Sequence, residues 1–385
     1  MLVDEKNAVE NMNSNSSYSV SLLPLCDCPE LNVLWQDLEA RSCCPFFLSW
    51  TWISSWLEAY EPECDVLRVE CNEEVVALGL LTRSASIAFN RFPSSKIHLH
   101  QTGNKSFDQI WLEYNGLLCD EHHHSECVKY AVNFLQKEYP SWDEFVIGAI
   151  TKKEASLIEQ YSGLGRYDLW QSSAYGVDLM SMRQTHSDYL SSLSRNTRYQ
   201  IRKSIKLYDK MGGLHLEYAK NSDQALTYLS DVAPFHLKRW RGISDGSGFS
   251  NPDFVRFHEI LIKNGWNSGQ IDIIKVSCGE RVVGYFYNFK YRNKVYFYLS
   301  GLCQEADSSL KPGLSGHALS IQKYMDEGYQ YYDFMGGDER YKASLGKKNN
   351  DLFQVAFQKP LLKFKTEHFL RYIKNRVLEG GNWFK

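Results

Sequence analysis

An internal repeat constrains the fold of this chain more than any other feature of its sequence. The stretch DVLRVECNEEVVA at residues 65–77 aligns with DIIKVSCGERVVG at residues 272–284, an offset of 207 residues, with six identical positions. Each copy has alternating apolar residues, a two-residue polar turn and a second apolar run, a pattern typical of a β-hairpin. Two copies so far apart indicate that the chain contains two related units.

The same order of predicted elements follows both hairpins. After the second copy come a strand (NKVYFYLSGL), a loop, a helix (GLSGHALSIQKYMDEG) and a strand (YQYYDFMG). After the first copy come SKIHLHQTG, a loop, the helical ECVKYAVNFLQKEYP and the strand WDEFVIGAI. This order predicts two similar α/β domains with mixed sheets. The predicted units are a disordered tail (1–17), an N-terminal domain (18–185), a C-terminal domain (186–365) and a C-terminal helix or tail (366–385).

Composition narrows the class of protein. The chain has 385 residues, of which 43% are hydrophobic and 23% charged, so it can fill a large core. A net charge of -3 argues against a protein that coats nucleic acid. The start of the chain has no apolar leader, no run reaches about 18 apolar residues, and the ten cysteines form no CxxC pair. We therefore expect a soluble cytoplasmic protein without membrane insertion.

A basic helix is predicted within residues 188–210, at the start of the second unit. Ser194 is a suitable N-cap, and apolar residues recur at helical spacing beyond it. Four cations, at steps of three and four residues, share one face: Arg195, Arg198, Arg202 and Lys206. This face is either a solvated flank or a phosphate-binding surface, since guanidinium groups grip phosphate in a bidentate manner.

Five motifs, in order, carry a resemblance to a known family. They are FLSWTWISSWLEAY, YLSSLSRNTRYQIRKSIKLYD, FHLKRW, SLKPGLSGHAL and DFMGGDERYKASLG. The set resembles the CelD/BcsL group of GNAT (GCN5-related) acyltransferases, named for cellulose biosynthesis, over roughly residues 45–360. The resemblance implies two tandem GNAT domains, a fold shared with the Fem-type aminoacyltransferases, and acetyl-CoA or another acyl-CoA as co-substrate.

The resemblance also implies where the donor binds. In GNAT domains acyl-CoA lies in a V-shaped opening between two central strands, which here implies the strand at residues 294–302 and the helix start that follows it. The helix after Pro-Gly offers unpaired N–H groups, expected from Leu314 to Gly316, and two glycines allow an anion to approach. The implied donor-binding residues are Leu302, Lys311, Gly313, Leu314, Ser315 and Gly316. Leu310 and Ser315 depart from the usual GNAT signature, so a phosphate-bearing donor other than CoA stays open.

The stretch YDFMGGDERYKASLG at residues 332–346 is the candidate catalytic segment. Its strand ends at Gly-Gly and is followed by charged residues, whereas the first copy continues with plain ITKKEA. Ligands gather at the carboxyl ends of strands in α/β sheets, so Asp338 or Glu339 is a candidate base, Tyr341 an acid and Lys342 a substrate-binding cation. The alternative is a solvated strand-ending turn. Asp333, inside the strand, is expected to make a structural hydrogen bond.

Two further segments contain histidines. In PFHLKRWRG, His236 has an unperturbed pKa suited to a base, and Arg239 and Trp240 are candidate acceptor-binding residues. In EHHHSEC, residues 121–127, consecutive side chains point apart and no spaced partner follows, so a polar loop is favoured over a metal site. We expect no metal.

Three functions remain open from the sequence. The first is transfer of an acyl group, foremost acetyl, from acyl-CoA to an amine or hydroxyl of a sugar, polysaccharide precursor or small metabolite, by direct attack in a ternary complex. The second is a Fem-like aminoacyltransferase that uses aminoacyl-tRNA, the one nucleic acid considered. The third is a binding protein whose GNAT domains are both inactive, since the first unit lacks the Pro-Gly motif and is expected to be degenerate.

Overall fold

The computed structural model describes residues 17–88, 92–139, 141–242 and 246–380. Almost all of the predicted tail at 1–17 lies outside the described residues, as do the last five residues of the predicted C-terminal segment. Within the described ranges, no helix combines the length and the apolar character needed to cross a membrane.

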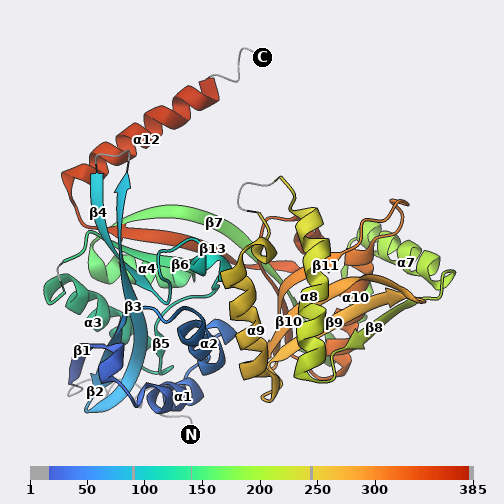
Figure 1. Ribbon diagram of the computed structural model, residues 1–385, viewed down its shortest axis with the longest axis horizontal. Helices are drawn as coiled ribbons and strands as arrows, with labels where there is room; N and C mark the ends of the chain where they lie inside the picture. The colour runs from blue at the N-terminus through green and yellow to red at the C-terminus, as the bar shows by residue number, and fades with distance from the viewer. Residues whose placement is uncertain (1–16, 89–91, 140, 243–245, 381–385) are drawn as a thin grey trace, which may run out of the picture.

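One mixed sheet runs through the whole molecule (Figure 1). Its strand order is β1-β2-β3-β4-β6-β13-β7-β12-β11-β10-β9-β8, and β5 pairs with β3 beside this path. The strands are β1 (Tyr18–Pro24), β2 (Cys64–Cys71), β3 (Glu74–Ala88), β4 (Phe92–Leu99), β5 (Leu118–Cys119), β6 (Glu144–Thr151), β7 (Gly165–Asp178), β8 (Leu214–Tyr218), β9 (Ile271–Cys278), β10 (Arg281–Tyr291), β11 (Lys294–Leu302), β12 (Tyr331–Gly336) and β13 (Lys347–Gln358). This mixed α/β architecture confirms the predicted fold class.

Helices cover both faces of the sheet (Figure 1). They are α1 (Leu31–Arg41), α2 (Trp50–Tyr60), α3 (His124–Lys137), α4 (Lys152–Ser162), α5 (Leu179–Gln184), α6 (Tyr189–Ser192), α7 (Arg195–Asp209), α8 (Ser222–Arg239), α9 (Pro252–Trp266), α10 (Pro312–Asp326), α11 (Arg340–Leu345) and α12 (Leu362–Gly380). Four short 3-10 turns are also described, at Leu25–Asp27, Phe46–Leu48, Phe107–Ile110 and Gly248–Ser250. The predicted basic helix is in fact α6 and α7, separated at Ser194, whose side chain caps α7 by accepting from Thr197 N at 3.2 Å.

The repeat is a structural repeat. The first copy forms the β2–β3 hairpin and the second the β9–β10 hairpin, as predicted. In the first, Asn72 and Glu73 both have positive φ (52° and 69°), the conformation that a tight two-residue hairpin turn requires. Each hairpin is followed by a strand, a helix and a parallel strand: β4, α3 and β6 in the first half, and β11, α10 and β12 in the second.

Strand β13 crosses from the second half back into the first. It lies between β6 and β7 and pairs with both of them in antiparallel fashion. The other edge of β7 pairs with β12 through residues 174–178, so β7 joins the two halves into one sheet. The predicted boundary at residue 185 stays a prediction, but the sheet continues across it, because β13 belongs by sequence to the second unit and by pairing to the first.

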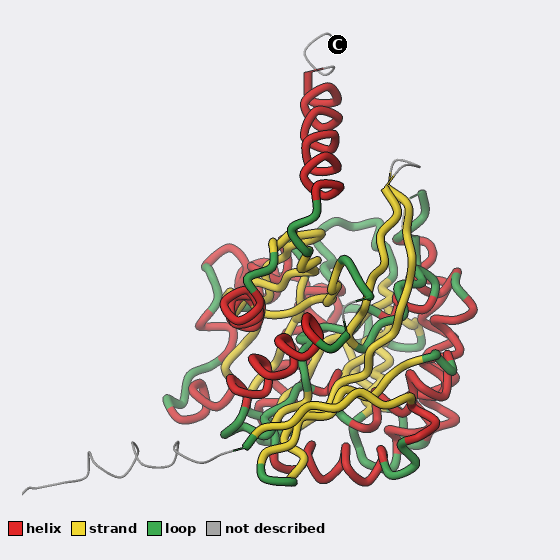
Figure 2. Tube along the Cα trace, turned by 90° about the vertical axis from the view of Figure 1, so that its left-hand side faces the viewer, coloured by secondary structure: helices red, strands yellow, loops and turns green. Residues whose placement is uncertain are grey.

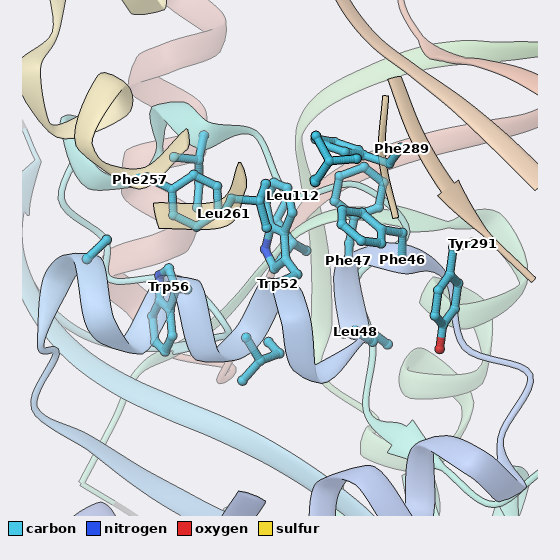
Figure 3. Close-up of a cluster of buried hydrophobic side chains, with 14 of the residues drawn as sticks. Phe46, Phe47, Leu48, Trp52, Trp56, Leu112, Phe257, Leu261, Phe289 and Tyr291 are labelled. Atoms are coloured by element: carbon cyan, nitrogen blue, oxygen red, sulfur yellow. The ribbon is translucent and has the colours of Figure 1, made fainter. Parts of the chain in front are cut away.

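A shared aromatic core lies between the two halves (Figure 3). Phe46 stacks on Phe289 of β10 at 4.5 Å between ring centroids, and Trp52 of α2 meets Phe257 of α9 at 4.8 Å. Helix α2 starts at Trp50, because Ser49 caps it by accepting from Trp52 N at 3.3 Å. Trp52 and Trp56 of this helix are buried and serve in core packing.

Candidate active site

Strands β11 and β12 define an opening in the second half. They are parallel, but only Lys294–Tyr296 pairs with Tyr331–Asp333, although both strands are described in full. In its pairing with β10, strand β11 has a register shift that leaves Tyr298 as an extra residue. A bulge of this kind turns a strand away from its neighbour. Beyond the paired residues, the edge of β11 that faces β12 therefore has no partner strand among the described residues.

Helix α10 starts directly beyond β11. The first helical hydrogen bond joins Ser315 N to Lys311 O at 2.9 Å, so the N–H groups of Gly313 and Leu314 precede it. This corrects the expectation that the unpaired groups run from Leu314 to Gly316. Gly316 is buried, and a Cβ there would lie 2.7 Å from the ring of Phe286, so this glycine serves close packing of helix on strand.

The predicted donor-binding residues at the start of α10 differ in how far they are buried. Leu302, Lys311, Gly313 and Leu314 are half-buried, and a Cβ at Gly313 would meet only Leu302 Cδ1 at 3.3 Å. Ser315 is fully buried and donates to Ser204 Oγ of α7 at 2.8 Å. Ser204 also accepts from Lys311 N at 2.8 Å. These bonds place the middle of α7 beside the start of α10.

The cationic face of α7 lies on the surface. Arg195, Arg202 and Lys206 are exposed, whereas Arg198 is half-buried and donates to Ser191 O at 3.1 Å. Among the described residues, no acidic side chain forms an ion pair with any of these four cations. A surface helix with unneutralised cations suits binding of an anion better than a salt-bridged flank does.

A wedge from the first half, residues 110–116, fills one side of the opening in the second half. It reaches both splayed strands, with one contact to β11 and two contacts at β12. These contacts are Tyr298 OH to Ile110 O, Gly336 N to Glu113 Oε2 at 2.8 Å, and Tyr114 OH to Asp333 Oδ2 at 2.8 Å. The N-terminal half thus supplies the wall of the C-terminal opening.

The same wedge closes the corresponding opening in the first half. Strands β4 and β6 are also parallel and pair only over Lys96–His98 and Glu144–Val146. Beyond the paired residues, Asn115 bridges the strands: its side-chain amide donates to Leu99 O at 2.8 Å and its backbone N–H to Ala149 O at 3.3 Å. A protein side chain therefore occupies this opening in the first half.

Backbone strain concentrates around the wedge. Trp111 and Tyr114 in the wedge have φ of 51° and 54°, and Met335 in β12 has φ of 62°. On the first-half side, His100 and Ala149 have φ of 53° and 45°. Side chains with a Cβ rarely adopt this left-handed conformation, and such strain in native proteins clusters at functional sites.

Glu113 is the principal site residue that the sequence did not predict. It is 2% exposed, and its second oxygen, Oε1, accepts from Trp111 Nε1 at 2.9 Å. Burial raises the pKa of Glu113 to about 7, although Lys342 and the N–H of Gly336 both act to lower it. A carboxylate with a pKa near neutrality is suited to a general base.

Asp333 lies at the point where β11 and β12 part. As predicted, it makes structural hydrogen bonds: besides Tyr114, its Oδ1 accepts from Met335 N at 2.7 Å. Burial raises the pKa of Asp333 to about 6. Both of its oxygens already serve to hold the strained backbone of β12 and the wedge.

Three of the predicted residues after β12 meet at the site. Lys342 is buried, donates to Gly336 O and pairs with Glu339 at 3.5 Å. Tyr341 stacks on His317 of α10 at 5.6 Å, and burial raises its pKa. Asp338 is exposed and accepts from Ser173 N of β7 at 3.3 Å, which turns it away from the cluster.

His317 is a second residue that the sequence did not single out. It is 1% exposed, lies among the rings of Phe297 and Phe334, and its Nδ1 is 3.1 Å from Tyr332 OH. Burial lowers its pKa to about 3, so the imidazole is neutral at physiological pH. Its position between the two splayed strands and Tyr341 makes it a spacer that fixes the tyrosine ring.

The end of α8 approaches the same cluster. His236 Nδ1 lies 2.7 Å from Ser247 Oγ, and the ring stacks on Trp240 at 5.8 Å. Burial and then Arg239 lower the pKa of His236 to about 4, which makes it a weaker base than Glu113. Arg239 is exposed and also acts to lower the pKa of Tyr341 and His317, so it faces the cluster.

Two cavities lie against the wedge. One has a volume of about 440 Å³ and is lined by both halves, including Tyr114, His124, Lys294 and Asp333. The other, of about 800 Å³, is lined by Trp111, Gly148, Asn251 and Gln354 among others. Trp111 is 40% exposed and packs edge-to-face against Trp170 at 4.9 Å. The wedge thus lines both cavities, the smaller one through Tyr114 and the larger one through Trp111.

The histidine-rich segment is only partly a loop. His124 already starts α3 and pairs with Glu154 at 3.1 Å, and this carboxylate raises the pKa of His124. The prediction of a polar loop over 121–127 is therefore wrong for its last four residues. In the described ranges, no group of three or more His, Cys, Asp or Glu side chains is arranged to hold a metal ion.

Comparison with known proteins defines the class. Residues 195–343 match the family model described as an acetyltransferase (GNAT) domain. This match spans α7 to α11, and with it the opening between β11 and β12. The chain therefore contains an acyltransferase domain of the GNAT class, as predicted, while the narrower CelD/BcsL assignment stays a prediction.

Solved structures resemble most of the fold. FemX superposes with a TM-score of 0.55 at 10% sequence identity, over 84% of this chain and 95% of FemX. The C-terminal domain (DUF2156) of a protein assigned as a lysylphosphatidylglycerol synthetase from Agrobacterium fabrum gives 0.51 at 11% identity, over 91% of this chain and 96% of that domain. A tandem GNAT protein of clavulanic acid biosynthesis gives 0.46 at 11% identity, over 88% and 98%. Comparison with curated protein sequences gives no significant match.

Proposed function

We propose that the protein transfers an acyl group from acyl-CoA, foremost acetyl-CoA, to an amine or hydroxyl group. The observation that carries this proposal is the opening between β11 and β12, which pair over three residues before they part. The pantetheine arm would lie along the unpaired edge of β11. The pyrophosphate would meet the N–H groups of Gly313 and Leu314 at the positive end of α10.

In this proposal Glu113 is the general base. The nucleophile of the acceptor attacks the thioester carbonyl, a C–N or C–O bond forms, and the C–S bond breaks. Glu113 takes the proton from the nucleophile, and with a pKa of about 7 roughly half of it is in the basic form at neutral pH. The wedge would thus contribute the base from the first half to a donor bound in the second.

Tyr341 is the proposed acid for the departing thiolate. Its raised pKa keeps its hydroxyl protonated at neutral pH, and its ring is held against His317. Cys303, at the end of β11, is a poor candidate for a covalent intermediate, because burial and Glu305 raise the pKa of its thiol to about 11. Direct transfer in a ternary complex is therefore the proposed route.

The proposed acceptor is a saccharide, a polysaccharide precursor or another small polar metabolite. The support is the larger cavity, where the exposed ring of Trp111 stands next to polar groups such as Asn251 and Gln354. Tryptophan offers a flat apolar surface with a polar edge, which suits a sugar ring. Arg239, Trp240 and Lys342 remain the proposed acceptor-binding residues on the side of α8 and α11.

A second candidate function is aminoacyl transfer from aminoacyl-tRNA. The observation that favours it is the exposed cationic face of α7 beside the start of α10. Contacts to an RNA backbone release counterions, so affinity would fall steeply with salt. The third candidate, a binding protein without activity, gains support for the first half alone, because Asn115 bridges the opening there.

Isothermal titration calorimetry with acetyl-CoA, longer acyl-CoAs and aminoacyl-tRNA separates the three candidates. Saturable acyl-CoA binding that Gly313→Asp weakens by at least about tenfold supports the first. The site has room for this change because only Leu302 is near, and Asn267→Asp adds the same charge at an exposed position at the end of α9 as a control. Salt-sensitive tRNA binding that Arg202→Ala abolishes supports the second. An intact fold that binds none of these donors would reject both.

A further inference from the structure

Helix α12 leaves the body of the molecule after its first turns (Figure 2). Its base is anchored: Phe364 is buried, Lys363 Nζ donates to Asp143 Oδ2 at 2.7 Å, and His368 stacks on Tyr167 at 4.4 Å. The later turns of the helix project away from the rest of the fold (Figure 1). These anchors fix the direction of the helix, so its outward face is a constant feature of the surface.

The outward face is apolar. Leu362 is 78% exposed, Phe369 61%, Ile373 42% and Leu370 37%. Leu362, Phe369 and Ile373 follow one another at seven and four residues, which aligns them along one side of a helix. No other helix in the described part of the chain has so many large apolar side chains at this level of exposure. An exposed apolar stripe of this kind marks a surface that binds another protein or a membrane.

Cations border the apolar stripe. Residues 362–380 contain five Lys or Arg and two Glu, a net charge of +3, whereas the whole chain carries -3. Lys365 is exposed and, at three residues after Leu362 and four before Phe369, lies beside the stripe. A helix that combines an apolar stripe with a basic net charge is the pattern that lies in the plane of an anionic bilayer surface.

We propose that α12 docks the protein onto an anionic lipid surface, with Leu362, Phe369 and Ile373 in the acyl-chain boundary and the flanking cations at the headgroups. The charge pattern selects this occupant over a second copy of the chain. Two α12 helices packed side by side would each bring a net charge of +3 to the contact, whereas anionic headgroups neutralise it. The helix lies on the surface and does not cross it.

Vesicle co-sedimentation of the full chain tests this proposal. We expect the protein to pellet with vesicles of phosphatidylcholine and phosphatidylglycerol, and to stay in the supernatant with phosphatidylcholine alone. The double variant Phe369→Glu, Ile373→Glu replaces two exposed apolar groups by acids and should weaken binding by at least about tenfold. Lys365→Glu should weaken binding less, and most strongly at low salt.

Val33→Glu is the matched control, because Val33 is 63% exposed on α1, away from α12. It should bind vesicles like the unchanged protein. Circular dichroism and thermal melting check that each variant stays folded. The proposal is overturned if the unchanged protein ignores anionic vesicles, or if the double variant binds them equally well. It is also overturned if light scattering shows that the double variant only dissociates a dimer and leaves vesicle binding intact.

Discussion

The carboxylate of Glu113 accepts a 2.8 Å hydrogen bond from the backbone N–H of Gly336, 223 residues further along the chain. This bond joins the first half of the molecule to the point where β12 ends in the second half. It holds a buried acid, with a raised pKa, beside the opening of the GNAT domain. A base contributed in this way makes the two halves a single catalytic unit in our proposal.

The first prediction concerns Glu113 as the base. Glu113→Gln should lower kcat by about 10²- to 10⁴-fold, the usual contribution of a general base, and leave the KM for acyl-CoA nearly unchanged. Steady-state kinetics at saturating acceptor measure both. Trp111→Phe is the control, because it removes the hydrogen bond to Oε1 and keeps the carboxylate. Equal losses in the two variants would assign Glu113 a structural role instead.

The pH dependence of the reaction follows from the same group. Activity should rise as pH increases through about 7, because Glu113 must lose its proton to act as a base. This rising limb should be absent in Glu113→Gln. A full pH profile of kcat measures it. If kcat still rises with pH in the same way in Glu113→Gln, another group sets the pH dependence.

Stability should respond to pH in the opposite sense. Between pH 4.5 and about 7 the folded protein keeps a proton on Glu113 that the unfolded chain releases, so the folded state is increasingly destabilised as pH rises. The contribution is about 3 kcal/mol over this window. Urea unfolding at pH 5 and pH 8 should show the unchanged protein losing more free energy of unfolding than Glu113→Gln does. Asp333 and His317 are buried in both proteins, and Asp333 acts on the pKa of Glu113, so the difference between the two proteins reports Glu113 together with its coupling to Asp333.

Lys342 should lower the pKa of Glu113. Lys342→Met removes the cation that lowers the pKa of Glu113, so that pKa should rise and the activity limb move to higher pH by about one unit. Glu339→Gln is the control, because it takes away the ion-pair partner of Lys342 but leaves the cation in place. Activity should therefore rise at a higher pH in Lys342→Met than in Glu339→Gln. If they coincide, Lys342 does not act on Glu113.

Asn115 should matter to stability more than to chemistry. Its side-chain amide donates to Leu99 O of β4, its backbone N–H donates to Ala149 O of β6, and its side-chain oxygen lies 3.0 Å from His100 Nδ1. Asn115→Ala leaves the Leu99 carbonyl without its amide donor and should cost about 1 to 3 kcal/mol of unfolding free energy. Asn264→Ala, which removes an amide bonded to Ser55 and Glu58 at the surface of α9, should cost about 1 kcal/mol or less. Thermal or urea denaturation compares them.

Local patterns account for the parts of the fold that the sequence predicted. The two hairpins depend on alternation and on short polar turns, and α7 depends on its stripe and on the Ser194 cap. These signals lie within a few residues of one another. The order of strand, helix and strand then follows from the repeat, which compares the chain with itself.

Contacts across long separations account for what the sequence did not predict. Glu113 lies in a loop of the first half. No pattern near it in the sequence predicts that Gly336 and Lys342 lie beside it in the folded chain. An acid between Trp111 and Tyr114 was the available signal, since aromatic neighbours favour burial. Asp338 illustrates the reverse case, because its position beside Glu339 suggested a site residue, whereas its side chain faces β7.

Because β13 lies between β6 and β7, the N-terminal half of the sheet can form in full only after β13 has been synthesised. During synthesis, β6 and β7 leave the ribosome long before residues 347–358 do, yet the gap between these two strands closes only when β13 enters it. Until then two strand edges of the N-terminal half stay open to unwanted pairing. A fragment that ends at residue 185 would lack β13, so the gap between β6 and β7 would stay open. The two repeats, alike in sequence and in plan, are therefore not separable as folding units, and the later one has to finish before the earlier one is whole.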